Sequence, residues 1–299
     1  MEALKWHKDL HNLMSISINF PYKRNTRSAK PRPLFRTTDA DTIKIEQPLR
    51  LVSCDTTEKS DYAGRPDISQ PKLDRCKERL NSGFYDNLPS GLREYLSEKI
   101  TPEAAAKHIN AGVDSVSAFE SMLESRLTLN DGTKRKVAVI PTGDMIDLYG
   151  RLLAYVAPWF SNTAEDPLPP RDDPRRKTFN LEMIENGWAA FFPIYPSLPS
   201  NDDMNLAIAA AELAWRSQKG AWEEYGNKLL LGYEFRMCIK LSKEGSANDR
   251  VAEAFERICV DLGDLSIVGK YDFYDIDPSH RLWIWENDIE KAKVDLNLQ

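Results

Sequence analysis

The sequence predicts an α+β fold, because patterns typical of short strands and patterns typical of amphipathic helices occur in separate parts of the chain. β-Branched residues dominate 42–45 and recur at 135–140, as in a half-buried strand. Residues 114–127 instead repeat apolar side chains every three or four positions, as an amphipathic helix does. The chain has 299 residues, 41% of them hydrophobic, which is enough to bury an extensive core.

The first part of the chain is basic, although the protein as a whole is acidic. The formal net charge is −6, yet residues 1–36 hold eight Lys and Arg against two Asp and Glu, a local charge of +6. The stretch 21–33 is rich in proline and basic residues, which is typical of a linker. We therefore predict a basic N-terminal arm and linker over 1–33, which either contacts phosphate groups or is a solvated tail.

Two strand-like runs follow the arm. The first covers 42–45, the second covers 49–52, and Pro48 lies in a turn between them. This spacing predicts a β-hairpin whose ends carry acidic residues and threonines. Further strands are expected at 135–140 and 150–156.

Helical patterns occupy much of the remaining chain. Thr101 and Pro102 form a good helix start, since a capping side chain precedes a proline at the first helical position. The predicted helices cover 71–81, 89–99, 101–110, 114–127, 179–186, 202–218, 227–242 and 248–262. Aromatic runs at 271–274 and 282–285 predict late strands, so the C-terminal part is expected to be α/β.

The four cysteines, Cys54, Cys76, Cys238 and Cys259, are too few for a disulfide framework. We interpret them as reduced thiols of a cytoplasmic protein. The N-terminus lacks the apolar stretch of a secretory signal, and no run approaches the roughly 20 apolar residues that cross a bilayer. The sequence therefore predicts a cytoplasmic location and no membrane partner.

Acidic residues at strand ends indicate a candidate cation site. Asp41 and Asp55 lie at the ends of the predicted strands, and Thr56 follows Asp55 directly. Carboxylates and a backbone carbonyl such as that of Thr56 are the oxygen ligands that Ca²⁺ takes. Glu58, three residues beyond Asp55, is placed to orient or deprotonate a water molecule.

Two arginines add a second element of the same chemistry. The planar guanidinium groups of Arg50 and Arg151 match phosphate oxygens and stay protonated at working pH. Such groups stabilise the charge that develops on a phosphodiester during hydrolysis. Each residue alone has an ordinary alternative, because strand-end aspartates form turns and strand arginines face solvent. Together the acidic residues and the arginines favour phosphodiester hydrolysis.

The order of these segments resembles the staphylococcal nuclease-like (thermonuclease) family. The resemblance rests on four motifs: Asp39-Ala40-Asp41-Thr42, then Arg50 followed by Asp55-Thr56-Thr57-Glu58, then Asp147-Leu148-Tyr149-Gly150-Arg151, then a helix with Ala211-Glu212 that closes on Gly220-Ala221-Trp222. It covers roughly 34–60 and 113–225, about half of the chain.

The resemblance implies both a fold and an activity. The implied fold is an OB-fold, a five-stranded β-barrel with packed helices, and this class commonly binds nucleic acid strands. The implied activity is Ca²⁺-dependent hydrolysis of phosphodiester bonds in DNA, with RNA left open. Little sequence preference and 3′-phosphate ends are expected.

By the same resemblance, each motif residue takes a role. The Ca²⁺ ligands would be Asp41, Asp55 and the carbonyl of Thr56, with Asp39 as support. Arg50 and Arg151 would bind the scissile phosphate, and Tyr149 would contact a neighbouring phosphate. Glu58 would be the candidate general base.

Departures from the family pattern define the expected domain organisation. Residues 64–112 enter where the family has a short loop, and we predict a small helical lid with hinges at its terminal glycines, Gly64 and Gly112. Residues 227–299 form a C-terminal extension, so the nuclease-like domain would span 34–226. Either the insertion or the extension is a candidate surface for a regulatory protein partner.

One further departure bears on function. Thr57 replaces the usual proline, which would loosen the backbone that carries Glu58. The alternative to an enzyme is a non-catalytic nucleic-acid or protein-binding module of the same fold. Retention of the acidic residues and both arginines argues against that alternative.

Overall fold

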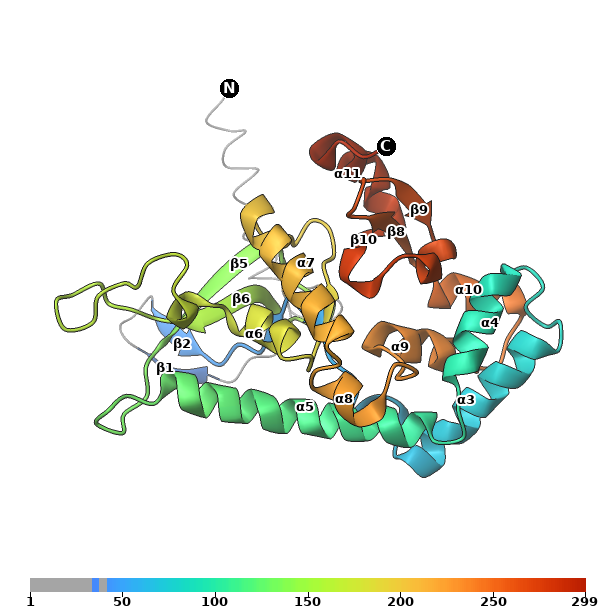
Figure 1. Ribbon diagram of the computed structural model, residues 1–299, viewed down its shortest axis with the longest axis horizontal. Helices are drawn as coiled ribbons and strands as arrows, with labels where there is room; N and C mark the ends of the chain where they lie inside the picture. The colour runs from blue at the N-terminus through green and yellow to red at the C-terminus, as the bar shows by residue number, and fades with distance from the viewer. Residues whose placement is uncertain (1–33, 38–41) are drawn as a thin grey trace, which may run out of the picture. The chain divides into compact units, whose positions relative to one another are not determined.

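The computed structural model describes residues 34–37 and 42–299, which form two compact units (Figure 1). The described part of the first unit consists of 34–37, 42–50 and 144–153. The second unit covers 51–143 and 154–299. The predicted arm at 1–33 and the candidate residues Asp39 and Asp41 lie outside the described residues. We describe each unit by itself.

The first unit contains an antiparallel strand pair, β1 (Leu34–Thr37) with β2 (Ile43–Ile45). The hairpin predicted between 42–45 and 49–52 is wrong, because β2 pairs with β1 and β3 (Leu49–Leu51) pairs elsewhere. The backbone N–H of Leu152 donates to the carbonyl of Pro48 at 2.9 Å. The turn residues therefore bind a later segment of the chain.

A three-stranded sheet has the order β3-β6-β5, in which β5 covers Val137–Ile146 and β6 covers Leu152–Pro158. Ser53 has a φ of 58°, in the left-handed region, which separates β3 from the next strand. That strand, β4 (Ser53–Asp55), pairs antiparallel with β7 (Ala190–Phe192).

A fourth sheet among the described residues lies in the C-terminal part, where β8 (Arg257–Asp261), β9 (Ile267–Gly269) and β10 (Arg281–Trp285) have the order β10-β8-β9. The mixed helix-and-sheet class is thus confirmed. Across residues 34–37 and 42–299, the sheets have two or three strands each and no closed five-stranded barrel is present.

The helices of the second unit are α2 (Ser60–Ala63), α3 (Pro66–Asn81), α4 (Ser90–Lys99), α5 (Ala104–Leu127), α6 (Phe179–Glu185), α7 (Asn201–Arg216), α8 (Ala221–Tyr225), α9 (Gly232–Leu241), α10 (Ala247–Ala254) and α11 (Ile289–Leu296). None of them has both the length and the apolar composition needed to cross a membrane, a statement that holds for the described residues. Most of the predicted helices are present within a few residues of their expected bounds.

Three local predictions are wrong. The two helices predicted at 101–110 and 114–127 are one continuous helix, α5, so Gly112 does not interrupt it. The helix predicted at 248–262 ends at Ala254, and the β-branched stretch after it forms β8. The strand predicted at 271–274 is a 3₁₀ turn, Asp272–Asp275.

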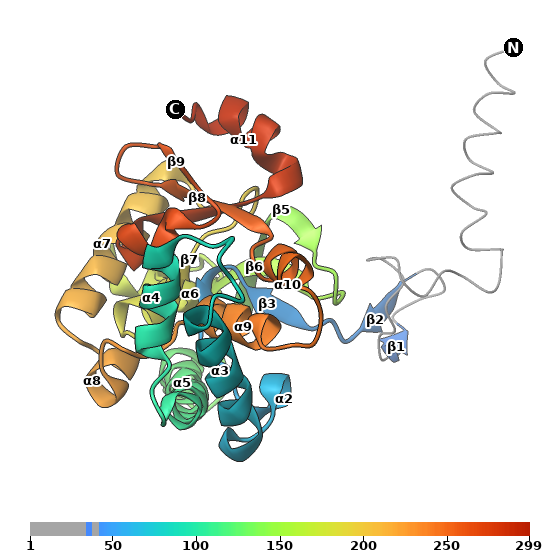
Figure 2. The ribbon, with the colours of Figure 1, turned by 90° about the vertical axis from the view of Figure 1, so that its right-hand side faces the viewer.

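The segment 64–112 is part of the main core, which corrects its interpretation as a lid. Leu73, Leu92 and Leu96 of α3 and α4 are fully buried. They belong to one hydrophobic cluster with Phe235 of α9 and Trp283 of β10. Figure 2 shows α3 and α4 beside α9. Helices that share their core with the C-terminal extension cannot open independently of it.

A buried polar network also joins α4 to the C-terminal part. The carboxylate of Glu234, which has no exposed surface, accepts from Lys99 Nζ at 2.6 Å and from Tyr95 Oη at 2.5 Å. Arg281 of β10 lies 3.5 Å from the same carboxylate. Desolvation raises the pKa of Glu234, but the adjacent Lys99 and Arg281 outweigh it, so the net shift is downward and the carboxylate stays charged.

Candidate active site

The predicted cation ligand Asp55 ends β4 and is nearly inaccessible. Its residue exposure is 3%, and its backbone pairs with Ala190 of β7. The chain then turns through Thr56 and Thr57 to Glu58, whose side chain keeps 27% of its surface exposed. The short segment 55–58 therefore presents one buried and one partly accessible carboxylate.

Both carboxylates are bound by one arginine from the C-terminal extension. Arg236 of α9 donates from Nη2 to Asp55 Oδ1 at 2.9 Å and to Asp55 Oδ2 at 2.8 Å. Its Nη1 donates to Glu58 Oε1 at 2.5 Å. The neighbouring carboxylates raise the pKa of Arg236 despite its burial, so its charge is fixed at any working pH. The result is a charge-assisted triad of two acids and one guanidinium.

A buried histidine holds the backbone of the same segment. The N–H of Glu58 donates to His108 Nε2 at 2.8 Å, and His108 Nδ1 lies 2.9 Å from the carbonyl of Leu230. Because Nε2 accepts, the proton must be on Nδ1, which donates to that carbonyl. The ring stacks on Phe235 with centroids 3.8 Å apart. Burial lowers the pKa of His108 to about 3, so the imidazole is neutral.

Two glycines allow helix backbones to approach the segment closely. A Cβ on Gly112 of α5 would lie 2.6 Å from the carbonyl oxygen of Glu58. A Cβ on Gly232 of α9 would overlap the carbonyl oxygen of Thr56. Gly112 is therefore a contact point inside a helix, and the predicted hinge at this position is wrong. The backbone that carries Glu58 is held by α5, α9 and His108, so the missing proline before it does not leave it loose.

The described ligand atoms do not fit a Ca²⁺ ion in this arrangement. Both oxygens of Asp55 and one of Glu58 accept hydrogen bonds from Arg236. The carbonyl of Thr56 faces the backbone of Gly232. A divalent cation would have to share these oxygens with a guanidinium of the same sign. Within 34–37 and 42–299, no group of three or more His, Cys, Asp or Glu side chains is arranged to hold a metal ion.

In the first unit, a tight turn positions the predicted phosphate ligand Arg151. The Asp147 carboxylate accepts from the backbone N–H of Tyr149 at 2.8 Å and of Arg151 at 2.9 Å. Its other oxygen accepts from Arg151 Nε and from Nη2, both at 2.7 Å. Gly150 completes the turn with a φ of 79°, a conformation that favours glycine. Arg151 is thus oriented before any ligand arrives.

The remaining predicted residues divide between the two units. Arg50 in β3 and Tyr149 belong to the first unit with Arg151, whereas Asp55, Thr56 and Glu58 belong to the second. The Tyr149 side chain is accessible, with 77% residue exposure, and the Arg151 guanidinium carbon lies 5.1 Å from its ring centre. That contact adds a cation–π interaction to the support of Arg151.

Sequence reasoning missed Arg236 and His108; of these two residues, only Arg236 carries a signal. Arg236 lies in a helix whose other residues, Lys240 excepted, are all buried. A charged residue in such a helix requires a partner, because an unpaired buried charge is costly. The sequence does not show which acids provide that partner, since Asp55 lies 181 positions away.

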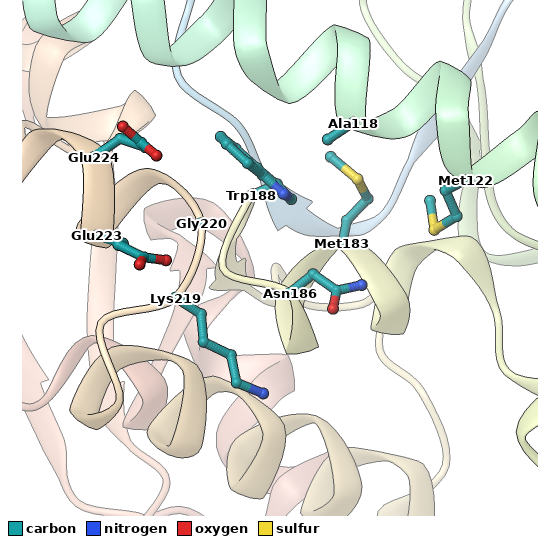
Figure 3. A pocket seen from close by; sticks show the side chains of 9 residues that line it. All are labelled: Ala118, Met122, Met183, Asn186, Trp188, Lys219, Gly220, Glu223 and Glu224. Atoms are coloured by element: carbon teal, nitrogen blue, oxygen red, sulfur yellow. The ribbon is translucent and has the colours of Figure 1, made fainter.

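A separate pocket of about 390 Å³ lies where α5, α6 and α8 meet (Figure 3). Met122, Met183 and Trp188 provide apolar walls, and Glu223 and Glu224 supply two carboxylates. Lys219 is the one cation among its lining residues. None of the predicted catalytic residues lines this pocket, and its net negative charge disfavours phosphate.

A family model matches part of the chain. Residues 102–224 match the family model described as staphylococcal nuclease homologue. The matched range includes the turn at Arg151 and the motif at Trp222, whereas the segment 55–58 and Arg236 lie outside it. No curated protein matches the chain. Residues 102–224 are therefore similar to staphylococcal nuclease homologues, and the family resemblance predicted from the sequence is confirmed over that range.

Proposed function

We propose that this chain is a nuclease that hydrolyses phosphodiester bonds of DNA or RNA with little sequence preference. The observation that carries the proposal is Arg151, an oriented and partly accessible guanidinium inside the family-matched range. A donor held in place before the substrate binds requires little reorganisation during the reaction, which is the basis of electrostatic catalysis. Arg50 is proposed to bind the same phosphate and Tyr149 a neighbouring one.

Glu58 is the proposed base that activates water. Its side chain keeps 27% of its surface accessible, as a group that exchanges a proton with water requires. Arg236 binds one of its oxygens, Oε1, and thereby fixes the orientation of the carboxylate. The buried Asp55 is unsuited to that role, because its side chain is only 2% exposed.

The family resemblance implies two finer points, of which the proposal keeps only the first. It implies 3′-phosphate ends and a Ca²⁺ requirement, with ligands at Asp41, Asp55 and Thr56. Asp41 is outside the described residues, and the other two ligands face α9 as described above. We derive no catalytic step through Ca²⁺. The cleavage assay described next also tests the alternative of a non-catalytic binding module.

The test incubates the purified full chain with end-labelled single- and double-stranded DNA and RNA, in Ca²⁺ and in EGTA. We expect cleavage, with products that phosphatase treatment shifts because they end in 3′-phosphates. Arg151→Ala should lower kcat by about 10²–10³ and change binding much less, since the guanidinium acts mainly in the transition state. Lysine should rescue poorly, because it lacks the planar fork.

A matched control distinguishes this effect from general loss of charge. Arg216→Ala removes an exposed arginine of α7 that forms a salt bridge with Glu212, four residues earlier on the same helix. It should keep the parent rate. If the wild type binds each polymer but cleaves none under any condition, the binding-module alternative replaces the nuclease proposal.

A further inference from the structure

We propose that Arg236 is the resident cation of the candidate site: its guanidinium takes the place beside Asp55 and Glu58 that a divalent metal would occupy, so this site functions without Ca²⁺. The catalytic part of this inference rests on the proposed nuclease function. Arg236 is a positioning residue, because it touches the two carboxylates and no substrate contact is assigned to it.

The contact geometry supports this assignment. One guanidinium binds three carboxylate oxygens at 2.5–2.9 Å, two on Asp55 and one on Glu58. A planar fork that spans two acids fixes their mutual orientation, as a metal shared by both would. Arg236 therefore performs both tasks of a bound cation, charge compensation and positioning of ligands.

Burial makes this cation indispensable to Asp55. The Asp55 side chain is 2% exposed and that of Arg236 is 20% exposed. A buried carboxylate that loses its partner is strongly destabilising. With Arg236 present, the triad carries a net charge of −1, and a divalent cation added beside it would be repelled by the guanidinium at short range.

The surroundings of α9 indicate that Arg236 is a permanent part of the site and not a releasable latch. Phe235, Cys238 and Leu241 on the same helix have no exposed surface. Glu234, the neighbour of Arg236, is held by the buried network with Lys99. Withdrawing Arg236 by moving α9 would expose these side chains and break that network, so the helix has no low-cost route away from Asp55.

The experiment measures the thermal unfolding and Ca²⁺ binding of the full chain. The wild type should have the same Tm in millimolar Ca²⁺ and in EGTA, and calorimetric titration with Ca²⁺ should give no heat from this site. Arg236→Gln should lower the Tm in EGTA by about 6–12 °C, the expected effect of breaking a buried ion pair by removing one partner. Millimolar Ca²⁺ should restore part of that loss, because the two carboxylates then lack a cation.

The matched control is Arg126→Gln. Arg126 of α5 forms a partly buried pair with Glu182 of α6, with side chains 17% and 19% exposed. Its loss should also lower the Tm, but Ca²⁺ should not restore it, because only one carboxylate is bound in this pair. If Arg236→Gln fails to fold, the double variant Asp55→Asn with Arg236→Gln replaces the ionic contact by neutral amides. It should fold and show no response to Ca²⁺.

Two outcomes would overturn the proposal. One is a wild-type Tm that is higher in Ca²⁺ than in EGTA, together with the loss of this difference in Asp55→Asn. The other is an Arg236→Gln protein whose Tm is unaffected by Ca²⁺ while the double variant still folds. Nuclease assays separate this proposal from the function itself. Equal cleavage in Ca²⁺ and in EGTA supports the nuclease function and the resident-cation role of Arg236. Cleavage only in Ca²⁺ rejects the role of Arg236 but keeps the nuclease function. Absence of cleavage rejects the nuclease function and leaves the role of Arg236 to the Tm measurements.

Discussion

Arg236 and His108 both hold the segment 55–58 in place. Arg236 contacts its side chains, and His108 contacts its backbone. Arg236 binds the carboxylates of Asp55 and Glu58, and His108 accepts the N–H of Glu58. Phe235, next to Arg236, stacks on the His108 ring, so the two supports are packed together. The orientation of Glu58 therefore depends on residues from α5 and α9 that no local motif includes.

The neutral state of His108 predicts an acid-dependent loss of stability. Its pKa is about 3 in the folded chain and about 6.5 when unfolded, so below pH 6.5 only the unfolded chain takes up this proton. Stability from this group is complete above pH 6.5 and falls as the pH drops toward 3, by about 1.4 kcal/mol per pH unit. Arg236 nearby also disfavours an imidazolium.

The measurement is urea unfolding of the wild type and of His108→Gln at a series of pH values between 7 and 3. The variant should be less stable at pH 7, because it loses the stacking on Phe235, but its stability should decline less steeply with acid. Parallel declines of the two proteins would contradict the assignment of this pH dependence to His108.

At the scale of elements, the sequence predicts much of the local structure and the Arg151 turn, but not which elements meet. The Asp147–Arg151 turn is visible in sequence because its hydrogen bonds span only a few residues. The contact between 55–58 and α9 depends on packing across the whole chain, which no local pattern records. The hairpin predicted at 42–52 is wrong for the same reason, because β3 pairs with β6, which lies about 100 residues later in the chain.

The core position of the 64–112 segment predicts that it is needed for folding. Leu96 of α4 is fully buried in the cluster shared with α9. Leu96→Ala should lower the free energy of unfolding by about 2–5 kcal/mol, as truncation in a packed core does. Leu213→Ala on α7 is the control, since Leu213 is 55% exposed and its loss should cost about 0.5 kcal/mol or less.

Urea unfolding at neutral pH measures both variants. Replacement of 65–111 by a short Gly/Ser linker extends the test, because it removes the helices that cover α9. That protein should lack a cooperative transition. A cooperatively folded deletion variant that cleaves duplex DNA better than the parent would restore the lid interpretation.

At the scale of the whole molecule, most of the chain has the same sign of charge as the proposed nucleic-acid substrate. The chain carries −6, of which residues 1–36 contribute +6, so the other 263 residues carry −12. An acidic body repels a polyanion at long range, and a basic segment is then needed to attract it. The residues that supply this attraction are separate from those proposed for the chemistry.

This separation predicts that the arm controls substrate capture and not the chemical step. Deletion of 1–33, which contains seven Lys and Arg, should weaken binding to DNA at low salt. It should also flatten the salt dependence, since each phosphate contact contributes about −0.9 to the log–log slope for duplex DNA and about −0.7 for single strands. The rate at saturating substrate should hardly change, because the arm holds none of the proposed catalytic residues.

Binding isotherms over a range of salt concentrations measure the slope, and a variant with Lys23, Arg24 and Arg27 changed to glutamine should show an intermediate value. A deletion protein with the parent's slope would identify the arm as a solvated tail.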